Sequence, residues 1–324
     1  MNDYKFYVIL GVLNLILYII FLRLGKNIGF IDKSKKFDNP ITVTSSGIII
    51  YLNFLILFIL FLFFEANLFN ILPNNFHYTL ISVSILILIS TLDDIKPVDP
   101  KIRLFFQLIC VYVSLTSIPI YEIEFPLKFS IFICLSIWVY FINITNFTDG
   151  SDGFLAVNTI FVFSTLIFLN QNLELDLFTS QIATYLLPSI IIFLYFNKPT
   201  AKMYLGDSGS IFLGFLNGYI FLELILNTQF NLAISLFVYP LLDCSLALTK
   251  KTLAGQPPWA DTSNYSFLQP TIKNNKNKSY VFFLNLFFNI LNTALIICQL
   301  FFGWFIIIFN IVLAIIFIII YEKK

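Results

Sequence analysis

The chain has 324 residues, of which 59% are hydrophobic and only 11% are charged, and its formal net charge is +1. Soluble domains have about half apolar and about a quarter charged residues, so this composition excludes an ordinary soluble protein. The nearly neutral charge offers no basic surface, and no nucleic-acid partner is expected. The four cysteines lack CxxC or Cys/His spacing, which predicts neither a zinc site nor a disulfide framework.

The apolar residues form repeated runs of about 18–20 positions, the length at which a helix crosses the hydrocarbon of a membrane. They predict an all-α, polytopic integral membrane protein with about 11 transmembrane helices. No long internal repeat or flexible linker divides the chain, so residues 1–324 are expected to form a single transmembrane domain. The first run lacks a small-residue cleavage site after it and is expected to be retained as a span. The expected spans are residues 4–22, 47–64, 79–92, 104–119, 129–146, 154–170, 180–196, 208–226, 231–248, 279–300 and 303–321.

The basic residues predict the orientation of these spans. With the amino terminus outside and the carboxyl terminus in the cytoplasm, all of the 19 Lys and Arg residues except Lys5 and Lys128 lie on the cytoplasmic side. This distribution follows the positive-inside rule. Short polar segments at the cytoplasmic ends of the spans are therefore the places to look for chemistry.

Two adjacent carboxylates, Asp93 and Asp94, end the third expected span. Adjacent like charges repel each other unless a cation or a substrate balances them. A solvated helix end is the alternative interpretation. The pair needs support from elsewhere in the sequence.

Residues 143–153, with the sequence NITNFTDGSDG, supply that support at the inner end of the fifth span. Asn143 and Asn146 lie about one helical turn apart, and Asp149 and Asp152 each precede a glycine. An Asn/Asp/Gly turn between two helices is the alternative. A plain turn, however, needs neither the paired asparagines nor the second aspartate.

A third polar segment brings Lys202, Gly206 and Asp207 to the start of the eighth span. Glycine lets backbone N–H groups approach a phosphate, and a helix N-terminus favours anions. Asp207 offers oxygen ligands for Mg²⁺, and Lys202 offers a point charge for a phosphate. The alternative is that Asp207 or Ser208 serves only as a helix cap. Together the three segments predict a pocket for a hard cation and phosphate groups.

A GxxxG pattern, formed by Gly214 and Gly218, lies within the eighth expected span. In membrane helices such spacing lets two backbones approach closely. It predicts either close helix packing within the chain or a dimer contact.

The polar segments resemble the motifs of the polyprenyl-phosphate N-acetylhexosamine-1-phosphate transferases, in the same order and over nearly the whole chain. The resemblance implies transfer of an N-acetylhexosamine-1-phosphate from a UDP-sugar to undecaprenyl or another polyprenyl phosphate, with release of UMP. It is closer to the undecaprenyl-phosphate N-acetylglucosamine-1-phosphate (O-antigen) branch than to the phospho-N-acetylmuramoyl-pentapeptide branch. The implied location is the bacterial inner membrane, with the active site facing the cytoplasm, and a homodimer is compatible with it. The matching segments are residues 92–94, 103–107, 143–153 and 202–209.

The same resemblance implies roles for individual residues. Asp207 would be the principal ligand of Mg²⁺, or of Mn²⁺ as the alternative ion. Asp93 and Asp94 would be catalytic, either assisting the metal site, as assigned to Asp94, or deprotonating the lipid phosphate. The substrate-binding residues would be Asn143, Asn146, Asp149, Asp152, Lys202, Tyr204, Gly206 and Arg103, with Tyr204 near the uracil.

One departure concerns the last large cytoplasmic loop, where members of this family generally carry a histidine cluster. The single histidine, His77, is expected on the outer side and cannot substitute for that cluster. Asn264 in the corresponding stretch can hydrogen-bond but does not titrate near neutral pH. Asp243 and Asp261 join Asn264 as candidate site residues without an assigned role.

Two other functions stay open. A degenerate homologue that binds lipid or nucleotide sugar without turnover is suggested by the missing histidines. A secondary transporter would place its acids near the midplane between inverted repeats, whereas here they lie at span ends and no repeat is visible. For the transferase, direct attack by the lipid phosphate on the sugar-linked phosphorus is expected, with a covalent aspartyl intermediate as the rival.

Overall fold

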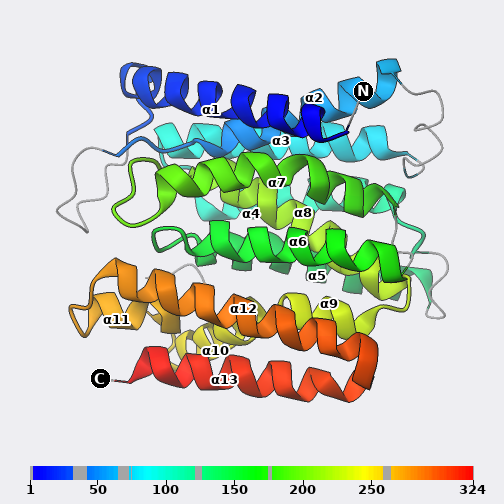
Figure 1. The fold of residues 1–324 in the computed structure, drawn as a ribbon, viewed down its shortest axis with the longest axis vertical. Coiled ribbons are helices and arrows are strands. Elements are labelled where there is room, and N and C mark those ends of the chain that lie inside the picture. The colour runs from blue at the N-terminus through cyan, green and yellow to red at the C-terminus, as the bar shows by residue number, and fades with distance from the viewer. Residues whose placement is uncertain are drawn as a thin grey trace.

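The structure, a computed structural model, describes residues 3–31, 42–64, 73, 75–120, 126–173, 177–257 and 264–323. These residues form helices and short 3-10 turns, and the only β-type pairings among them are isolated bridges. The long helices lie side by side as one bundle (Figure 1). The helices are α1 Asp3–Ile28, α2 Gly47–Phe64, α3 Phe76–Ile95, α4 Pro100–Ser114, α5 Leu127–Thr148, α6 Phe154–Leu173, α7 Leu177–Asn197, α8 Gly206–Leu226, α9 Phe230–Leu236, α10 Val238–Leu253, α11 Gln269–Ile272, α12 Lys278–Phe302 and α13 Ile307–Glu322.

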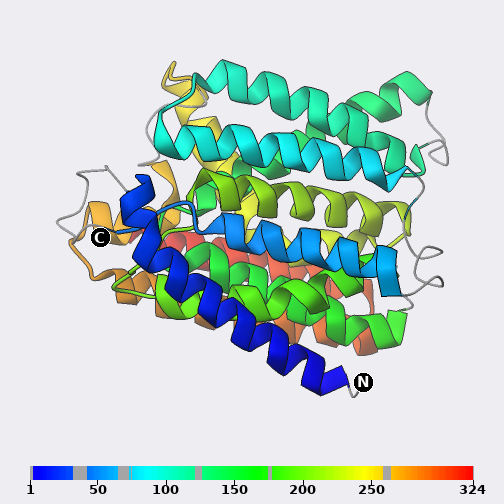
Figure 2. The same ribbon diagram turned by 90° about the horizontal axis from the view of Figure 1, so that it is seen from above.

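The all-helical, polytopic membrane fold expected from the sequence is confirmed. Seven of the described helices are long and apolar enough to cross a membrane, or eight if the bent pair α9 and α10 counts as one span. The views in Figures 1 and 2 place the start of α1 and the end of α13 at opposite ends of the bundle. The total of about 11 spans, the orientation and the single domain stay predictions, and the basic residues Lys33, Lys35 and Lys36 lie outside the described residues.

Two expected spans differ from the helices that form. The fourth was expected to reach residue 119, but α4 ends at Ser114 and continues only as the 3-10 turn Leu115–Ser117. Ser114 and Ser117 direct their hydroxyls to main-chain oxygens there, which suits a helix end, and Pro119 has no N–H to extend it. At its other end α4 begins where the Asp99 carboxylate caps the Lys101 N–H.

The ninth expected span is bent by 67° between α9 and α10. Amide side chains from α12 and α13 satisfy polar groups near this break. The Asn292 amide donates to the Ser235 main-chain oxygen at 2.9 Å, and the Gln299 amide donates to the Ser235 hydroxyl at 2.7 Å. Asn310 in turn donates to the Asn292 side-chain oxygen at 2.8 Å. Broken helices are tolerated at membrane depth where neighbouring groups satisfy the freed backbone in this way.

Helix α8 lies at the centre of the bundle. In its most apolar stretch of 18 residues, 89% of the residues are buried, and the helix packs on α2, α3 and α5. Gly214 faces α5 closely: a Cβ atom there would lie 2.7 Å from the Ile142 Cα. A Cβ atom at Gly218 would lie 2.3 Å from the Trp138 ring, and the Trp138 indole donates to the Phe215 oxygen at 2.8 Å. The GxxxG pattern therefore mediates close packing of α5 and α8 within the chain.

Replacing Gly214 by alanine is expected to lower the thermal stability of the purified protein, because the added methyl group would overlap the α5 backbone. Gly11 in α1 is the matched control, since a Cβ atom there meets nothing within 4 Å. Gly11→Ala is expected to leave the melting temperature unchanged or to raise it, as alanine is the better helix former. Equal melting temperatures for the two variants would contradict this packing.

Candidate active site

The polar segments singled out in the sequence meet at one end of the bundle, and the Asp94 carboxylate lies at their junction. Asp94 ends α3, and its two oxygens accept from the Asp207 N–H at 2.8 Å and from the Ser208 N–H at 3.2 Å. The Ser45 hydroxyl donates to the same carboxylate at 2.7 Å. The first turn of α8 has no capping side chain of its own, so Asp94 supplies the acceptor that a helix N-terminus requires.

Gly206 makes this approach sterically feasible. Its φ of 75° lies in the left-handed region, which favours glycine. A Cβ atom at this position would lie 2.6 Å from the Asp94 carboxylate and 2.7 Å from the Ser45 nitrogen. Gly206 therefore shapes the backbone at the start of α8, where it was expected to border a substrate.

Arg103 of α4 joins the other two carboxylates of this region. Its Nη1 donates to Asp93 Oδ2 at 2.7 Å and also forms an ion pair with Asp207 Oδ2. The other oxygen of Asp93 accepts from the Val98 N–H at 2.5 Å. The neighbouring residues Asp93 and Asp94 thus point to different partners: Asp93 to the loop before α4 and its arginine, Asp94 to the start of α8.

Asp149 is the carboxylate of this region that has neither a hydrogen-bond donor nor a cation as a partner among the described residues. It follows the last residue of α5, and within the described residues its side chain forms no hydrogen bond or ion pair. Burial, together with the nearby carboxylates of Asp207, Asp94 and Asp152, raises the pKa of Asp149 well above its usual value. Negative charge is therefore in excess at this point.

Asp152 is nearly completely buried and has two partners. Its Oδ1 accepts from the Lys278 ammonium at 2.7 Å, and its Oδ2 accepts from the Ala201 N–H at 3.2 Å. The Lys278 ammonium also lies 3.4 Å from the Tyr204 hydroxyl. Lys202, which was expected to contact a phosphate, is exposed and lies beside this group in the chain.

The two asparagines of α5 lie on a cavity of about 330 Å³ between α4, α5 and α10. Asn143 donates to the Gln107 side-chain oxygen at 2.8 Å, and the Asn146 oxygen accepts from the Ser210 hydroxyl at 2.7 Å. Arg103 lines the same cavity. Most of its other lining side chains are apolar, namely Pro100, Leu104, Val139, Tyr140, Ile144, Phe147 and Leu248.

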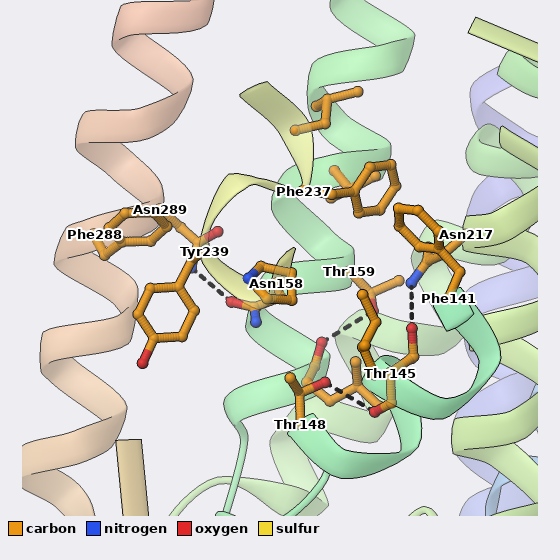
Figure 3. Close-up of a pocket in the computed structure, with 15 residues that line it drawn as sticks. Phe141, Thr145, Thr148, Asn158, Thr159, Asn217, Phe237, Tyr239, Phe288 and Asn289 are labelled. Carbon is orange, nitrogen blue, oxygen red and sulfur yellow. Dashed lines mark hydrogen bonds between the residues drawn. The ribbon is translucent and has the colours of Figure 1, made fainter. Parts of the chain in front are cut away.

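A second cavity, of about 30 Å³, lies among α5, α6, α8, α12 and the bend between α9 and α10. Figure 3 displays amide and hydroxyl groups around it: Asn217 donates to the Thr145 hydroxyl, and Asn289 donates to the Asn158 oxygen at 2.8 Å. The Asn217 oxygen is buried without a hydrogen-bond partner. This volume has room for about one water molecule, so the cavity is too small for either expected substrate.

From Asn264 onward, the stretch expected to correspond to the histidine cluster packs into the bundle. Tyr265, Ser266 and Phe267 are almost fully buried, and Asn264 is half-buried. The Ser266 N–H donates to Asp243 Oδ1 at 3.0 Å, so Asp243 anchors this segment to α10. Asp261 lies outside the described residues.

Several contacts at the site were not found from the sequence. Ser45 lies in no motif, and the motif around Gln107 and the segment before Ser210 did not indicate their partners, because those partners are distant in the chain. Lys278, by contrast, could have been recognised from the sequence. It is the first residue of α12, where a positive charge opposes the helix dipole. Such a charge is unfavourable without a negative partner, so a nearby carboxylate could have been predicted. Its partner, Asp152, is 126 residues away.

The described residues of the site include more carboxylates than cations, but they do not form a complete set of metal ligands. Five carboxylates gather here (Asp93, Asp94, Asp149, Asp152 and Asp207), and the contacts given above pair them with two cations, Arg103 and Lys278. Among the described residues no three His, Cys, Asp or Glu side chains converge to hold a metal ion. Mg²⁺ is commonly held by one or two carboxylates together with water and substrate phosphates, and this donor set fits that kind of binding.

Comparison with known proteins finds one matching family model and several transferases of similar sequence. Residues 76–225 match the sequence model of "Glycosyl transferase family 4". The chain is 28% identical over 187 residues to a phospho-N-acetylmuramoyl-pentapeptide-transferase of Aliarcobacter butzleri, which covers 45% of this chain and 52% of that protein. It is 26% identical over 186 residues to a probable undecaprenyl-phosphate N-acetylglucosaminyl 1-phosphate transferase of Bacillus subtilis, covering 53% and 52%. It is also 32% identical over 94 residues to a phospho-N-acetylmuramoyl-pentapeptide-transferase of Leuconostoc citreum, covering 27% and 28%. The match to the first two spans about half the length of each relative.

Asp149→Asn is expected to raise the melting temperature of the protein near pH 8 in the absence of divalent cations. The folded-state pKa of Asp149 is raised, so its ionised form costs stability at a pH above that pKa, and the cost disappears as pH falls through it. The difference between variant and wild type should therefore shrink on acidification. A difference that does not change with pH would contradict charge repulsion as its cause.

Proposed function

We propose that this chain transfers an N-acetylhexosamine-1-phosphate from a UDP-sugar to undecaprenyl or another polyprenyl phosphate, because residues 76–225 match the sequence model of glycosyl transferase family 4. The products are UMP and a polyprenyl-diphosphate-sugar, the first lipid-linked intermediate of a cell-envelope glycan. The proposal depends most on one observation: Arg103 joins two of the gathered carboxylates and also lines a largely apolar cavity.

The apolar cavity suits the lipid substrate. Its wall includes Leu104, Val139 and Leu248, which can pack against prenyl groups, and Arg103 is the one charged residue among the described residues that line it. Guanidinium groups bind phosphate well, so the lipid phosphate is placed at Arg103 and the prenyl tail along the apolar wall. The site end of the bundle is proposed to face the cytoplasm of a bacterial inner membrane, in accord with the positive-inside distribution of basic residues.

Mg²⁺ is the proposed cofactor, with Mn²⁺ as the alternative. Asp207 and Asp149 would hold it, because among the described residues Asp149 has no cationic partner and Asp207 shares Arg103 with Asp93. When bound, the ion offsets the charge of the diphosphate and of the leaving UMP. Asp94, assigned to the metal site on the sequence, has both oxygens engaged by Ser45 and the α8 backbone. Its proposed contribution is to hold Asp207 in position.

The proposed reaction is a direct displacement. An oxygen of the lipid phosphate attacks the sugar-linked phosphorus, a new P–O bond forms, and the P–O bond to UMP breaks with the electron pair leaving on UMP. Arg103 holds the lipid phosphate, and Asp93, in contact with that guanidinium, accepts any proton that the phosphate carries. A phosphosugar covalently trapped on Asp93 or Asp94 would replace this route with the two-step alternative.

We place the nucleotide-sugar donor on the side of the carboxylates opposite the lipid cavity. Tyr204, Asp152 and Lys278 border this region, and the N–H groups at the start of α8 lie nearby. Asn146 lies between the donor region and the lipid cavity. Relatives with either an N-acetylglucosaminyl or an N-acetylmuramoyl-pentapeptide substrate in their names match the chain, so the sugar is to be identified by assay. A homodimer is proposed on the resemblance alone.

A degenerate homologue is the second candidate function, because Tyr265, Ser266 and Phe267 are buried in the stretch where titratable side chains are usual for such enzymes. The decisive assay uses detergent-solubilised protein with undecaprenyl phosphate, Mg²⁺ and a panel of UDP-N-acetylhexosamines, including UDP-N-acetylmuramoyl-pentapeptide. Lipid-dependent UMP release that EDTA abolishes supports the transferase. Binding of a donor without any release supports the degenerate homologue.

Asp207→Asn is expected to lower UMP release by at least about a hundredfold without unfolding the protein, because it removes the carboxylate charge from the proposed metal site. Asp99→Asn is the control: Asp99 only caps α4, so activity should stay within about threefold of wild type. Wild-type activity of Asp207→Asn would remove the metal assignment.

Ser136→Trp is expected to raise the KM for polyprenyl phosphate about tenfold or more, since the indole would occupy the apolar cavity that Ser136 lines. The KM for the nucleotide sugar should not change. Thr116→Trp, at an exposed position beyond α4, is the matched control and should leave both constants unchanged. An unchanged lipid KM in Ser136→Trp would place the prenyl chain elsewhere.

A further inference from the structure

We infer that the small cavity in Figure 3 is a binding site for one water molecule. The water donates one hydrogen bond to the side-chain oxygen of Asn217 in α8 and another to the hydroxyl oxygen of Thr159 in α6. The site is independent of the proposed transferase reaction, because none of the five gathered carboxylates lines it.

The size of the cavity limits its occupant. Its volume of about 30 Å³ has room for about one water molecule and for no larger ligand. All of its lining residues except Asn158 and Pro240 are buried. A molecule inside it is therefore surrounded mainly by protein and is held by whatever polar groups the lining offers.

One of these polar groups lacks a partner. The Asn217 amide donates to the Thr145 hydroxyl at 3.3 Å, but the Asn217 oxygen is buried and has no hydrogen-bond partner among the described residues. A buried polar atom without a partner is costly, and more so at membrane depth, where no bulk water can replace the partner. Asn217 therefore requires a donor that the described protein groups do not supply.

The nearby hydroxyl groups add further acceptors. Thr159 donates its one proton to the Leu155 main-chain oxygen at 2.9 Å, and Thr148 donates to the Thr145 main-chain oxygen at 2.8 Å. A hydroxyl that has donated its proton still carries lone pairs that accept. A ligand that satisfies Asn217 and Thr159 together must donate twice, and a water molecule has two protons to donate.

Charge distinguishes water from an ion as the occupant. No charged residue is among the described residues that line the cavity. A cation there would be buried without a counter-charge, and an anion would meet oxygen atoms that can only accept. Cavities stay dry where their lining is apolar, whereas amide and hydroxyl groups surround this one (Figure 3). Water is the ligand that fits this lining.

The bound water links two helices through polar contacts. Thr159 belongs to α6 and Asn217 to α8, and Thr148 of the same lining is the last residue of α5. The water thus connects α6 with the central helix beside the last turn of α5. Its contribution is to the stability of the fold, so its loss lowers the melting temperature.

The first test is a crystal structure of the full-length protein at about 2 Å resolution or better. We expect a density peak about 2.5–3.0 Å from both Asn217 Oδ1 and Thr159 Oγ1. A well-ordered Asn217 without such a peak would overturn the inference. A peak closer than about 2.5 Å, with several further oxygen neighbours, would identify a cation and would also overturn it.

The second test is a double-mutant cycle in detergent-solubilised full-length protein. Asn217→Leu and Thr159→Val each remove one acceptor of the same water, so each is expected to lower the melting temperature by about 3 °C or more. Removing both leaves an apolar cavity that requires no water. The double variant should therefore lose at least about 2 °C less than the sum of the two single losses.

Thr165→Val is the matched control for this cycle. Thr165 is a buried threonine of the same helix that donates to the Phe161 main-chain oxygen at 2.7 Å, but it does not line the cavity. Its effect should add fully to that of Asn217→Leu. Full additivity of Thr159→Val with Asn217→Leu as well would contradict a shared water. If Asn217→Leu does not fold, the wild-type crystal structure decides.

Discussion

The arrangement of this site depends on the contact between the Asp94 carboxylate and the first turn of α8. The N–H groups that open α8 have no capping side chain on their own segment, so the end of α3 supplies the acceptor, and the Ser45 hydroxyl completes it. An uncapped helix end beside the hydrocarbon of a membrane would be costly. This single carboxylate therefore joins three segments distant in sequence and fixes where Asp207 lies. The left-handed Gly206 is part of the same solution, because any side chain there would displace the carboxylate.

Charge is the second constraint. Once Asp94 has fixed the start of α8, Asp207 lies within reach of Asp93 through Arg103, and Asp149 is left among carboxylates with no cation in contact within the described residues. The two proposed phosphate-bearing substrates require positive charge to accompany them into such a region. This electrostatic imbalance, rather than a preformed ligand cage, is the physical reason for proposing a divalent cation at Asp207 and Asp149. Arg103 then has two tasks, balancing these carboxylates and presenting a guanidinium to the apolar cavity.

The segment after α10 is held by aromatic packing and one carboxylate. In the stretch where the sequence lacks the histidines of the resembled family, Tyr265 and Phe267 lie in the core, with Phe267 stacked on Phe154 and Tyr265 on Phe147. Asp243 anchors the segment through the Ser266 N–H. Phe147 also lines the proposed lipid cavity, so the aromatic packing of this segment supports the wall of that cavity.

The sequence by itself determined that the chain folds into membrane-spanning helices and where most of them lie. Runs of apolar residues have a length dictated by the membrane, so most span positions could be predicted, and alternating spans must bring every second polar segment to the same face. It did not determine which side chains would meet. Asp93 and Asp94 are neighbours on one helix end yet bind different partners, and Lys278 reaches Asp152 across 126 residues. The bend between α9 and α10 likewise depends on amides of α12 and α13. Periodicity and composition report the environment of each residue, whereas contacts between distant segments are decided only when the helices pack and their buried polar groups find partners.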